Sequence, residues 1–238
     1  MAAGINPKVR PFHSTTAAFA NGSDTPRDFL ERCIEVIDAH EGTIGAFVAT
    51  NLDGARAAAD EATSRWKAGN PLSPIDGIPI GVKDVMETAD MATEQGSPLF
   101  EGWKMGRDCA AVAALREAGA IVVGKTVTTE FAATQPRGTR NPYDIDRTPG
   151  GSSSGSAAAV GSGMLAGGTA SQVIGSTIRP ASYCGAFGFK PSVGGINRGG
   201  SFDGFSQSCT GVIAATLTDT WVMAREMSSR AGGDAGYV

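Results

Sequence analysis

Amine and hydroxyl side chains that suit proton transfer and nucleophilic attack gather in three segments of the sequence. In the first segment, Lys83 follows the apolar run at residues 77–82. A lysine that enters a dry pocket loses hydration, its pKa falls, and its neutral amine can then act as a base. The alternative is a lysine at the end of a strand whose amine reaches water.

Small residues and hydroxyls dominate the second segment, residues 148–160, which reads TPGGSSSGSAAAV and contains Ser152 and Ser153. Small residues let backbones approach closely, and clustered hydroxyls can relay protons. A flexible Gly/Ser linker is the other interpretation. The apolar run at residues 157–160 argues against a linker, because it indicates that a helix begins there with a serine as N-cap.

The third segment, residues 172–192, places Ser176 directly after Gly175 and before a predicted helix start. Backbone N–H groups at such a position can form an oxyanion hole, although a serine that only caps the helix fits the same pattern. Arg179 follows Ser176 by three residues. Its guanidinium can bind a substrate carboxylate in a bidentate manner or form an internal salt bridge.

Two shorter motif matches do not carry function. Residues 119–126 fit the pattern GxxxxGK[ST] of phosphate-binding loops, but the intervening residues are typical of a strand, and the predicted helix precedes the match. Residues 151–155 fit GxSxG, which would make Ser153 a nucleophile that needs a later histidine. The only histidines of the sequence are His13 and His40, so a histidine after a central nucleophile is excluded.

Composition excludes several classes of protein. The chain has 238 residues, 41% of them hydrophobic, which is enough for a packed core. Its net charge is 20 − 24 = −4, so nucleic acid is not expected as a ligand. No run of 18 apolar residues predicts a membrane span, and the first 20 residues lack the apolar core of a secretory signal. The four cysteines form no CxxC pair, which indicates free thiols and a cytoplasmic protein.

Alternating helices and strands predict an α/β fold that positions the three segments. Thr25 and Pro26 are typical of a helix start, and Asp53 and Asp108 are expected to cap two further helices. The predicted strands are residues 44–50, 78–82 and 120–124. A last helix is expected at residues 218–229, with three side chains in the core: Trp221, Val222 and Met227.

The three segments, in this order, resemble the amidase signature family, whose core motif is a Gly/Ser-rich block followed by GS…RPA and GxKPS/T segments. Residues 150–160 read GGSSSGSAAAV, residues 179–185 read RPASYCG and residues 188–192 read GFKPS. The resemblance is nearest to bacterial amidases of the malonamidase type. It implies a mixed β-sheet flanked by helices, with a helical region at about residues 1–70 and a signature core at about 77–191. Residues 1–238 would then be only the N-terminal half of the family fold.

The resemblance also implies a Ser–cis-Ser–Lys triad. Ser176 matches the nucleophile, Ser152 matches the bridging serine that follows a cis peptide bond, and Lys83 matches the base. Three backbone N–H groups match the oxyanion hole: those of Val173, Ile174 and Gly175. Three further side chains are expected to support these groups or to contact substrate: Ser153, Gln172 and Arg179. Of these, Ser153 is expected to hydrogen-bond Lys83.

The activity that the resemblance implies is hydrolysis of a small carboxamide to a carboxylic acid and ammonia or an amine. The reaction would use an acyl-enzyme, and no metal, cofactor, nucleic acid or membrane is expected to take part. Two alternatives remain, namely an A-like subunit of an amidotransferase and an incomplete amidase with weak turnover. Without a second half to complete the sheet, we expect an exposed strand edge or apolar surface near Ser176. A homo-oligomer or a complementary C-terminal segment would cover that surface.

Overall fold

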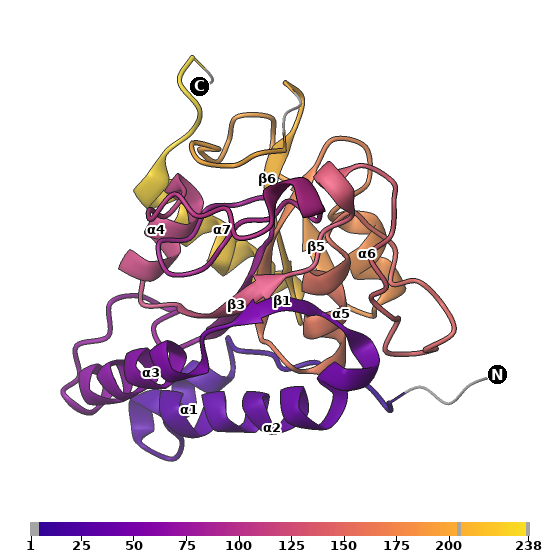
Figure 1. Cartoon of the computed structure of the whole chain (residues 1–238). Coiled ribbons are helices and arrows are strands. Elements are labelled where there is room, and N and C mark those ends of the chain that lie inside the picture. Colours follow the sequence, from indigo (N-terminus) through magenta and orange to yellow (C-terminus); the bar gives the residue numbers. More distant parts are fainter. Residues whose placement is uncertain (1–4, 204–205, 237–238) are drawn as a thin grey trace.

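A six-stranded sheet forms the centre of the molecule (Figure 1). Its strands lie in the order β1-β3-β2-β4-β6-β5. The computed structural model describes residues 5–203 and 206–236. β2 runs parallel to both β3 and β4, whereas the other pairings are antiparallel. This mixed sheet confirms the predicted α/β class. The strands are β1 (Phe47–Thr50), β2 (Pro79–Lys83), β3 (Ile121–Thr126), β4 (Gly167–Gln172), β5 (Phe187–Phe189) and β6 (Cys209–Ala214).

Helices cover both faces of the sheet, and side chains that alternate along the strands show which helices cover which face. Val122 and Val212 belong to the core cluster that contains residues of α4 and α7. Their neighbours Val123 and Ile213 belong to a second cluster, with residues of α5 and α6. Figure 1 shows α1, α2 and α3 grouped together at one end of the molecule. The helices are α1 (Thr15–Asn21), α2 (Pro26–Ile44), α3 (Leu52–Lys67), α4 (Ala110–Glu117), α5 (Ser154–Ser162), α6 (Ile178–Tyr183), α7 (Leu217–Ala231) and the 3-10 turns η1 (Pro98–Phe100) and η2 (Glu130–Ala132).

Helices α2 and α7 are both predicted from the sequence, and the structure agrees with most of what is expected of them. α2 begins as predicted, because the side chain of its N-cap Thr25 accepts a hydrogen bond from Asp28 N. α7 covers the predicted range, and Met227 is buried with Val222 packed against the core. The prediction that Trp221 lies in the core is wrong, because this side chain is 57% exposed. None of the described helices is long and apolar enough to cross a membrane.

Two of the predicted helix caps are wrong, in each case because another residue takes the position. The N-cap of α3 is Asn51, whose side chain accepts a hydrogen bond from a backbone N–H of the first turn, and Asp53 lies inside the helix. The N-cap of α4 is Cys109. The carboxylate of Asp108 instead accepts a hydrogen bond from Ala89 N, so it serves a neighbouring loop.

α5 is buried along its whole length, and the small residues of the Gly/Ser-rich block make this possible. A Cβ at Gly155 would lie 2.2 Å from the carbonyl oxygen of Ala46, so only glycine allows this close approach to the β1 side of the sheet. Near the other end of the helix, a Cβ at Gly161 would lie 2.2 Å from the carbonyl oxygen of Cys184. The segment is therefore a packed helix and not a linker, and Ser152 lies just before its first turn.

Exposed apolar side chains surround the edge of the sheet at β5. Among the described strands, β5 pairs only with β6. We call the exposed side chains of β5 and the adjoining helices α6 and α7 the β5-edge surface, which consists of Ile178, Tyr183, Phe187, Leu217 and Trp221. This surface agrees with the expectation of an exposed strand edge, since α6 follows Ser176 directly along the chain.

Candidate active site

Lys83 lies at the end of β2 and reaches hydroxyl groups from two other segments. Its backbone N–H donates to Thr169 Oγ1 at 2.9 Å, and its Nζ donates to Ser171 Oγ at 2.8 Å. The same Nζ donates to Ser152 Oγ at 2.8 Å. Thr169 and Ser171 lie two residues apart on β4, so the period of the strand places both hydroxyls on the face that meets Lys83. The parallel pairing of β2 with β4 therefore sets the position of the amine beside Ser152.

The Lys83 side chain is 0% exposed, so the alternative of an amine that reaches water is wrong. Burial lowers the pKa of Lys83 to about 7 because the charged form loses its hydration, and the negative charge of Asp203 opposes this shift. The hydrogen-bond partners of the amine are hydroxyls, which do not hold a proton on the nitrogen as a carboxylate would. Near neutral pH a large fraction of the amine is therefore neutral, which a base requires.

Ser152 precedes α5, and the peptide groups on both sides of it are held by other segments. The bond between Gly151 and Ser152 is cis. The carbonyl oxygen of Gly151 accepts two hydrogen bonds from the Arg179 guanidinium, at 3.2 Å from Nε and 2.8 Å from Nη2. The Ser152 carbonyl accepts a hydrogen bond from Thr129 N at 3.0 Å. Arg179 thus contacts backbone, and no carboxylate among residues 5–203 and 206–236 forms the internal salt bridge that was one interpretation of this residue.

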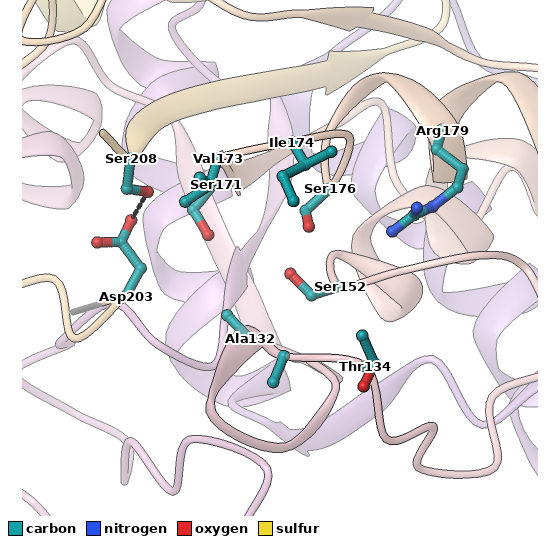
Figure 2. A pocket seen from close by; sticks show the side chains of 11 residues that line it. Ala132, Thr134, Ser152, Ser171, Val173, Ile174, Ser176, Arg179, Asp203 and Ser208 are labelled. Atoms are coloured by element: carbon teal, nitrogen blue, oxygen red, sulfur yellow. Dashed lines mark hydrogen bonds between the residues drawn. The ribbon is translucent and has the colours of Figure 1, made fainter. Parts of the chain in front are cut away.

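Ser176 lies in the loop between β4 and α6, and its hydroxyl faces a cavity (Figure 2). Within the described part of the chain, Ser176 Oγ forms no hydrogen bond, so the hydroxyl is available to a ligand. The backbone N–H groups of Val173, Ile174 and Gly175 also donate to none of the described residues. The loop therefore offers a free hydroxyl and free N–H donors, which is the combination that acyl transfer uses.

Gln172 and Ser153 contact the Ser176 loop and not Lys83. Gln172 Oε1 accepts hydrogen bonds from Thr177 N at 2.8 Å and Ile178 N at 2.9 Å, which fixes the start of α6. The backbone N–H of Ser153 donates to the Ser176 carbonyl at 3.3 Å. The Ser153 hydroxyl is buried without a hydrogen-bond partner in the described residues, so the expected contact with Lys83 is wrong. Ser153 is the N-cap residue of α5, but its side chain forms no capping hydrogen bond.

The cavity has a volume of about 310 Å³ and joins segments that lie far apart in the sequence. Figure 2 shows the hydroxyls of Ser152 and Ser176 pointing toward each other, with Arg179 on one side. Ile174 is 90% exposed, and its side chain lies at the cavity. The complete lining combines hydroxyl, apolar and two charged side chains: Ala132, Ala133, Thr134, Ser152, Ser171, Val173, Ile174, Ser176, Arg179, Asp203 and Ser208.

Six of the residues that line this cavity are not predicted from the sequence, and three of them form side-chain hydrogen bonds at the site: Ser171, Asp203 and Ser208. Ser171 contacts Lys83, and the alternation of hydroxyls at Thr169 and Ser171 is a signal for it once β4 is recognised as a strand. Asp203 and Ser208 lie between the last motif and β6, in a stretch without periodicity. No local pattern in this stretch indicates that the two residues reach the cavity.

The cysteines add no nucleophile to this site. All four cysteines are buried and unpaired. Burial raises the pKa of Cys184, the cysteine inside the matched motifs, to about 12, so its thiol is a poor nucleophile at neutral pH. In the described part of the chain, no group of three or more His, Cys, Asp or Glu side chains is placed to hold a metal ion.

Comparison with known proteins gives one consistent result. The Amidase family model matches residues 28–237. The chain is 38% identical over 229 residues to the A subunit of glutamyl-tRNA(Gln) amidotransferase from Oleidesulfovibrio alaskensis, a match that covers 93% of this chain and 46% of that protein. Among solved structures, it is similar to the native peptide amidase from Stenotrophomonas maltophilia, with a TM-score of 0.86 and 29% identity over 93% of this chain and 49% of that one. It is also similar to the A subunit of glutamyl-tRNA(Gln) amidotransferase from Thermotoga maritima, with a TM-score of 0.71 and 30% identity over 85% of this chain and 43% of that one. The chain thus spans about half the length of the curated relatives it matches.

Proposed function

The chain belongs to the amidase family, and we propose that it hydrolyses a linear amide bond through an acyl-enzyme formed on Ser176. The observation that carries this proposal is the hydrogen bond of 2.8 Å between the buried Lys83 amine and Ser152 Oγ, because Ser152 lines the same cavity as Ser176. A lysine of low pKa is a base, and a hydroxyl between it and the nucleophile can relay the proton. Such a relay needs no histidine.

In the proposed reaction, the Ser176 proton moves to Ser152 Oγ while the Ser152 proton moves to the neutral Lys83 amine. Ser176 Oγ then forms a bond to the amide carbon, and the carbonyl oxygen becomes the oxyanion of a tetrahedral intermediate. The proton returns along the same route to the amide nitrogen, the C–N bond breaks, and ammonia or an amine leaves. A water molecule deprotonated by the same relay attacks the ester. The acid is released, and the Ser176 hydroxyl is restored.

Neighbouring groups have supporting roles in this proposal. The free N–H groups of residues 173–175 would stabilise the oxyanion. Ser171 accepts a hydrogen bond from Lys83 Nζ and so holds the amine in place. Arg179 holds the Gly151 carbonyl. Because its guanidinium also lines the cavity, Arg179 is placed to meet a carboxylate of the substrate.

Ammonia release from a panel of small linear amides tests the proposal. We expect kcat/KM to be constant above about pH 7 and to fall about tenfold per pH unit below it, because protonation of Lys83, whose pKa is about 7, removes the base. A pH profile measured with the amide that is hydrolysed fastest checks this. A rate that does not change between about pH 9 and about pH 5 would contradict Lys83 as the base. If no amide of the panel releases ammonia, the proposed activity itself is contradicted.

A second candidate function is participation in an amidotransferase, because the relative from Oleidesulfovibrio alaskensis is the A subunit of such an enzyme and this chain spans 46% of it. In this case we propose that the β5-edge surface pairs with a polypeptide equivalent to the unmatched half of that relative. A strand edge presents unpaired N–H and C=O groups, and large apolar side chains gathered around it favour such pairing. Amide hydrolysis without tRNA or partner chains favours the first function, whereas activity that requires added partner chains favours the second.

Replacing Phe187 with lysine should weaken association at the β5-edge surface, since it places a charge on an edge side chain that is 50% exposed. Val48→Lys is the matched control, because Val48 is 40% exposed on the opposite edge strand β1. Size-exclusion chromatography with light scattering should show the wild type and Val48→Lys bound to the co-expressed unmatched half of the relative. Phe187→Lys should elute mainly unbound. A wild type that leaves the co-expressed half unbound would contradict the pairing.

A further inference from the structure

The cavity carries two side chains of opposite charge in addition to its hydroxyls. Among the residues that line it, Arg179 and Asp203 are the charged ones. In the view of Figure 2, Asp203 lies with Ser208 on one side, Arg179 lies on the other, and Ser152 and Ser176 lie between them. A substrate whose acyl group is bonded to Ser176 would therefore lie near a carboxylate as well as near a guanidinium.

Asp203 is a buried carboxylate without a cationic partner among the described residues. The residue is 5% exposed. One of its oxygens, Oδ2, accepts a hydrogen bond from the Ser208 hydroxyl, which orients the group. Within residues 5–203 and 206–236, the other oxygen accepts no hydrogen bond, and no lysine, arginine or histidine forms an ion pair with Asp203. A charge in this position is costly unless a ligand supplies the missing partner.

Lys83 does not supply that partner under the conditions of catalysis. The Lys83 amine donates its hydrogen bonds to Ser152 and Ser171 and forms no salt bridge with Asp203. The base must also be neutral for the proposed reaction, so it carries no charge that would offset the carboxylate. The negative charge of Asp203 is thus available to a positively charged group in the cavity.

We propose that Asp203 forms a subsite for the ammonium group of an amino-substituted carboxamide. This inference rests on the proposed amide hydrolysis and adds the class of its acyl group. A cationic hydrogen-bond donor would pair with the Asp203 oxygen that accepts no hydrogen bond from the described residues, while Ser208 holds the other oxygen. The apolar side chains of Ala132 and Val173 in the same lining suit the methylene groups between the ammonium and the amide carbon.

A series of paired amides of increasing chain length tests the subsite. Each ω-amino amide, in which two to five methylene groups join an ammonium group to a primary carboxamide, is compared with a neutral counterpart that ends in a methyl group instead. Dissociation constants come from NMR titration and kcat/KM from ammonia release, at about pH 8, where an alkyl ammonium is charged and Lys83 is mostly neutral. At one or two chain lengths, we expect the wild type to prefer the ammonium member about tenfold or more in both quantities.

Asp203→Asn should abolish this preference in the dissociation constants and in kcat/KM. The matched control is Asp38→Asn, which removes the same charge from an exposed position of α2 and should keep the preference. Ser208→Ala keeps the Asp203 carboxylate but removes the hydrogen bond that orients it, and should reduce the preference in part. If Asp203→Asn does not fold, Ser208→Ala and the amide series on the wild type still decide the question.

Three outcomes separate the subsite from its alternatives. If the neutral member binds as well as the ammonium member at every length, the subsite is overturned. If Asp203→Asn lowers kcat/KM of both members alike, so that the preference remains, Asp203 acts only through Lys83, and the subsite is again overturned. If the wild type binds the ammonium members preferentially but releases ammonia from no amide, the subsite stands and the proposed hydrolysis is contradicted.

Discussion

Ser176→Ala should abolish covalent labelling by a fluorophosphonate and lower kcat for amide hydrolysis by about 10⁴-fold or more, as expected when the nucleophile of a serine hydrolase is removed. Ser176 Oγ faces the cavity, and the free N–H groups of residues 173–175 lie in the same loop. A phosphonate bound there would mimic the tetrahedral intermediate and place an oxygen toward these donors. Peptide mass spectrometry of the labelled wild type should therefore find the adduct on Ser176.

Two further variants serve as controls for the labelling of Ser176. Ser182→Ala removes an exposed hydroxyl of α6, six residues from Ser176, and should be labelled like the wild type. Ser152→Ala keeps the nucleophile but interrupts the relay to Lys83, so it should be labelled much more slowly. Undiminished labelling of Ser176→Ala, with the adduct on another serine, would show that the nucleophile is assigned to the wrong residue.

Lys83→Met should inactivate the enzyme and at the same time stabilise the fold at pH 7. The folded protein holds Lys83 with a pKa of about 7, whereas a lysine exposed to water has a pKa of 10.5, so folding at pH 7 costs roughly 4–5 kcal/mol at this side chain. Methionine avoids that cost. It leaves the hydroxyls of Ser152 and Ser171 without the amine, which offsets about 1–3 kcal/mol. The expected net gain in the free energy of unfolding is therefore about 2 kcal/mol at pH 7.

The change in the free energy of unfolding that Lys83→Met causes depends on pH. Between pH 7 and about pH 10.5 the unfolded chain carries the Lys83 proton and the folded chain does not, so the stability of the wild type rises by about 1.4 kcal/mol per pH unit from this group. The advantage of Lys83→Met should therefore shrink as the pH rises and vanish before about pH 10. Urea denaturation of both proteins at several pH values measures the difference. A difference that does not change with pH would contradict the lowered pKa.

Lys125→Met is the informative comparison, because Lys125 is the second fully buried lysine of the described chain. Burial also lowers the pKa of Lys125, but Asp84 lies 3.4 Å from its Nζ and opposes the shift. Removing Lys125 leaves the buried Asp84 carboxylate without its cation, so this variant should be destabilised. Two buried lysines are thus expected to respond to the same substitution with opposite signs.

The sequence predicts the residues of the candidate site that lie in contiguous motifs. Lys83, Ser152 and Ser176 each stand in a segment whose composition is unusual. The structure brings Ser152 and Ser176 to one cavity, and Lys83 into hydrogen-bond contact with Ser152. Their catalytic roles remain predictions. The mixed sheet and its flanking helices follow from the resemblance and are confirmed, and the start of α2 follows from Thr25 and Pro26 alone.

The remaining parts of the fold depend on contacts that no local pattern records. β4 reads GGTASQ, which lacks the branched and aromatic residues of a typical strand, and it becomes a strand because β2 and β6 flank it. The hydrogen bond between Lys83 and Ser171 therefore cannot be predicted from the sequence of this segment. Trp221 has the spacing of a core residue on α7, but it is 57% exposed and belongs to the β5-edge surface. Spacing alone does not distinguish an apolar side chain of the core from one of an exposed apolar surface. Asp203 reaches the cavity through tertiary packing alone.

In the proposed reaction, the contact between Arg179 and the Gly151 carbonyl would link the binding of an anionic ligand thermodynamically to the alignment of the relay. Arg179 also lines a second cavity, next to Gly150 and Tyr183, so its guanidinium is accessible from two directions. An anion that draws the guanidinium away competes with the carbonyl of the residue that precedes Ser152. Linkage is reciprocal, so any ligand that favours one position of Arg179 is itself bound more tightly when Ser152 is held in the matching position. If Arg179 binds a ligand from either cavity, part of the binding energy would therefore be used to set the positions of Ser152 and its neighbours.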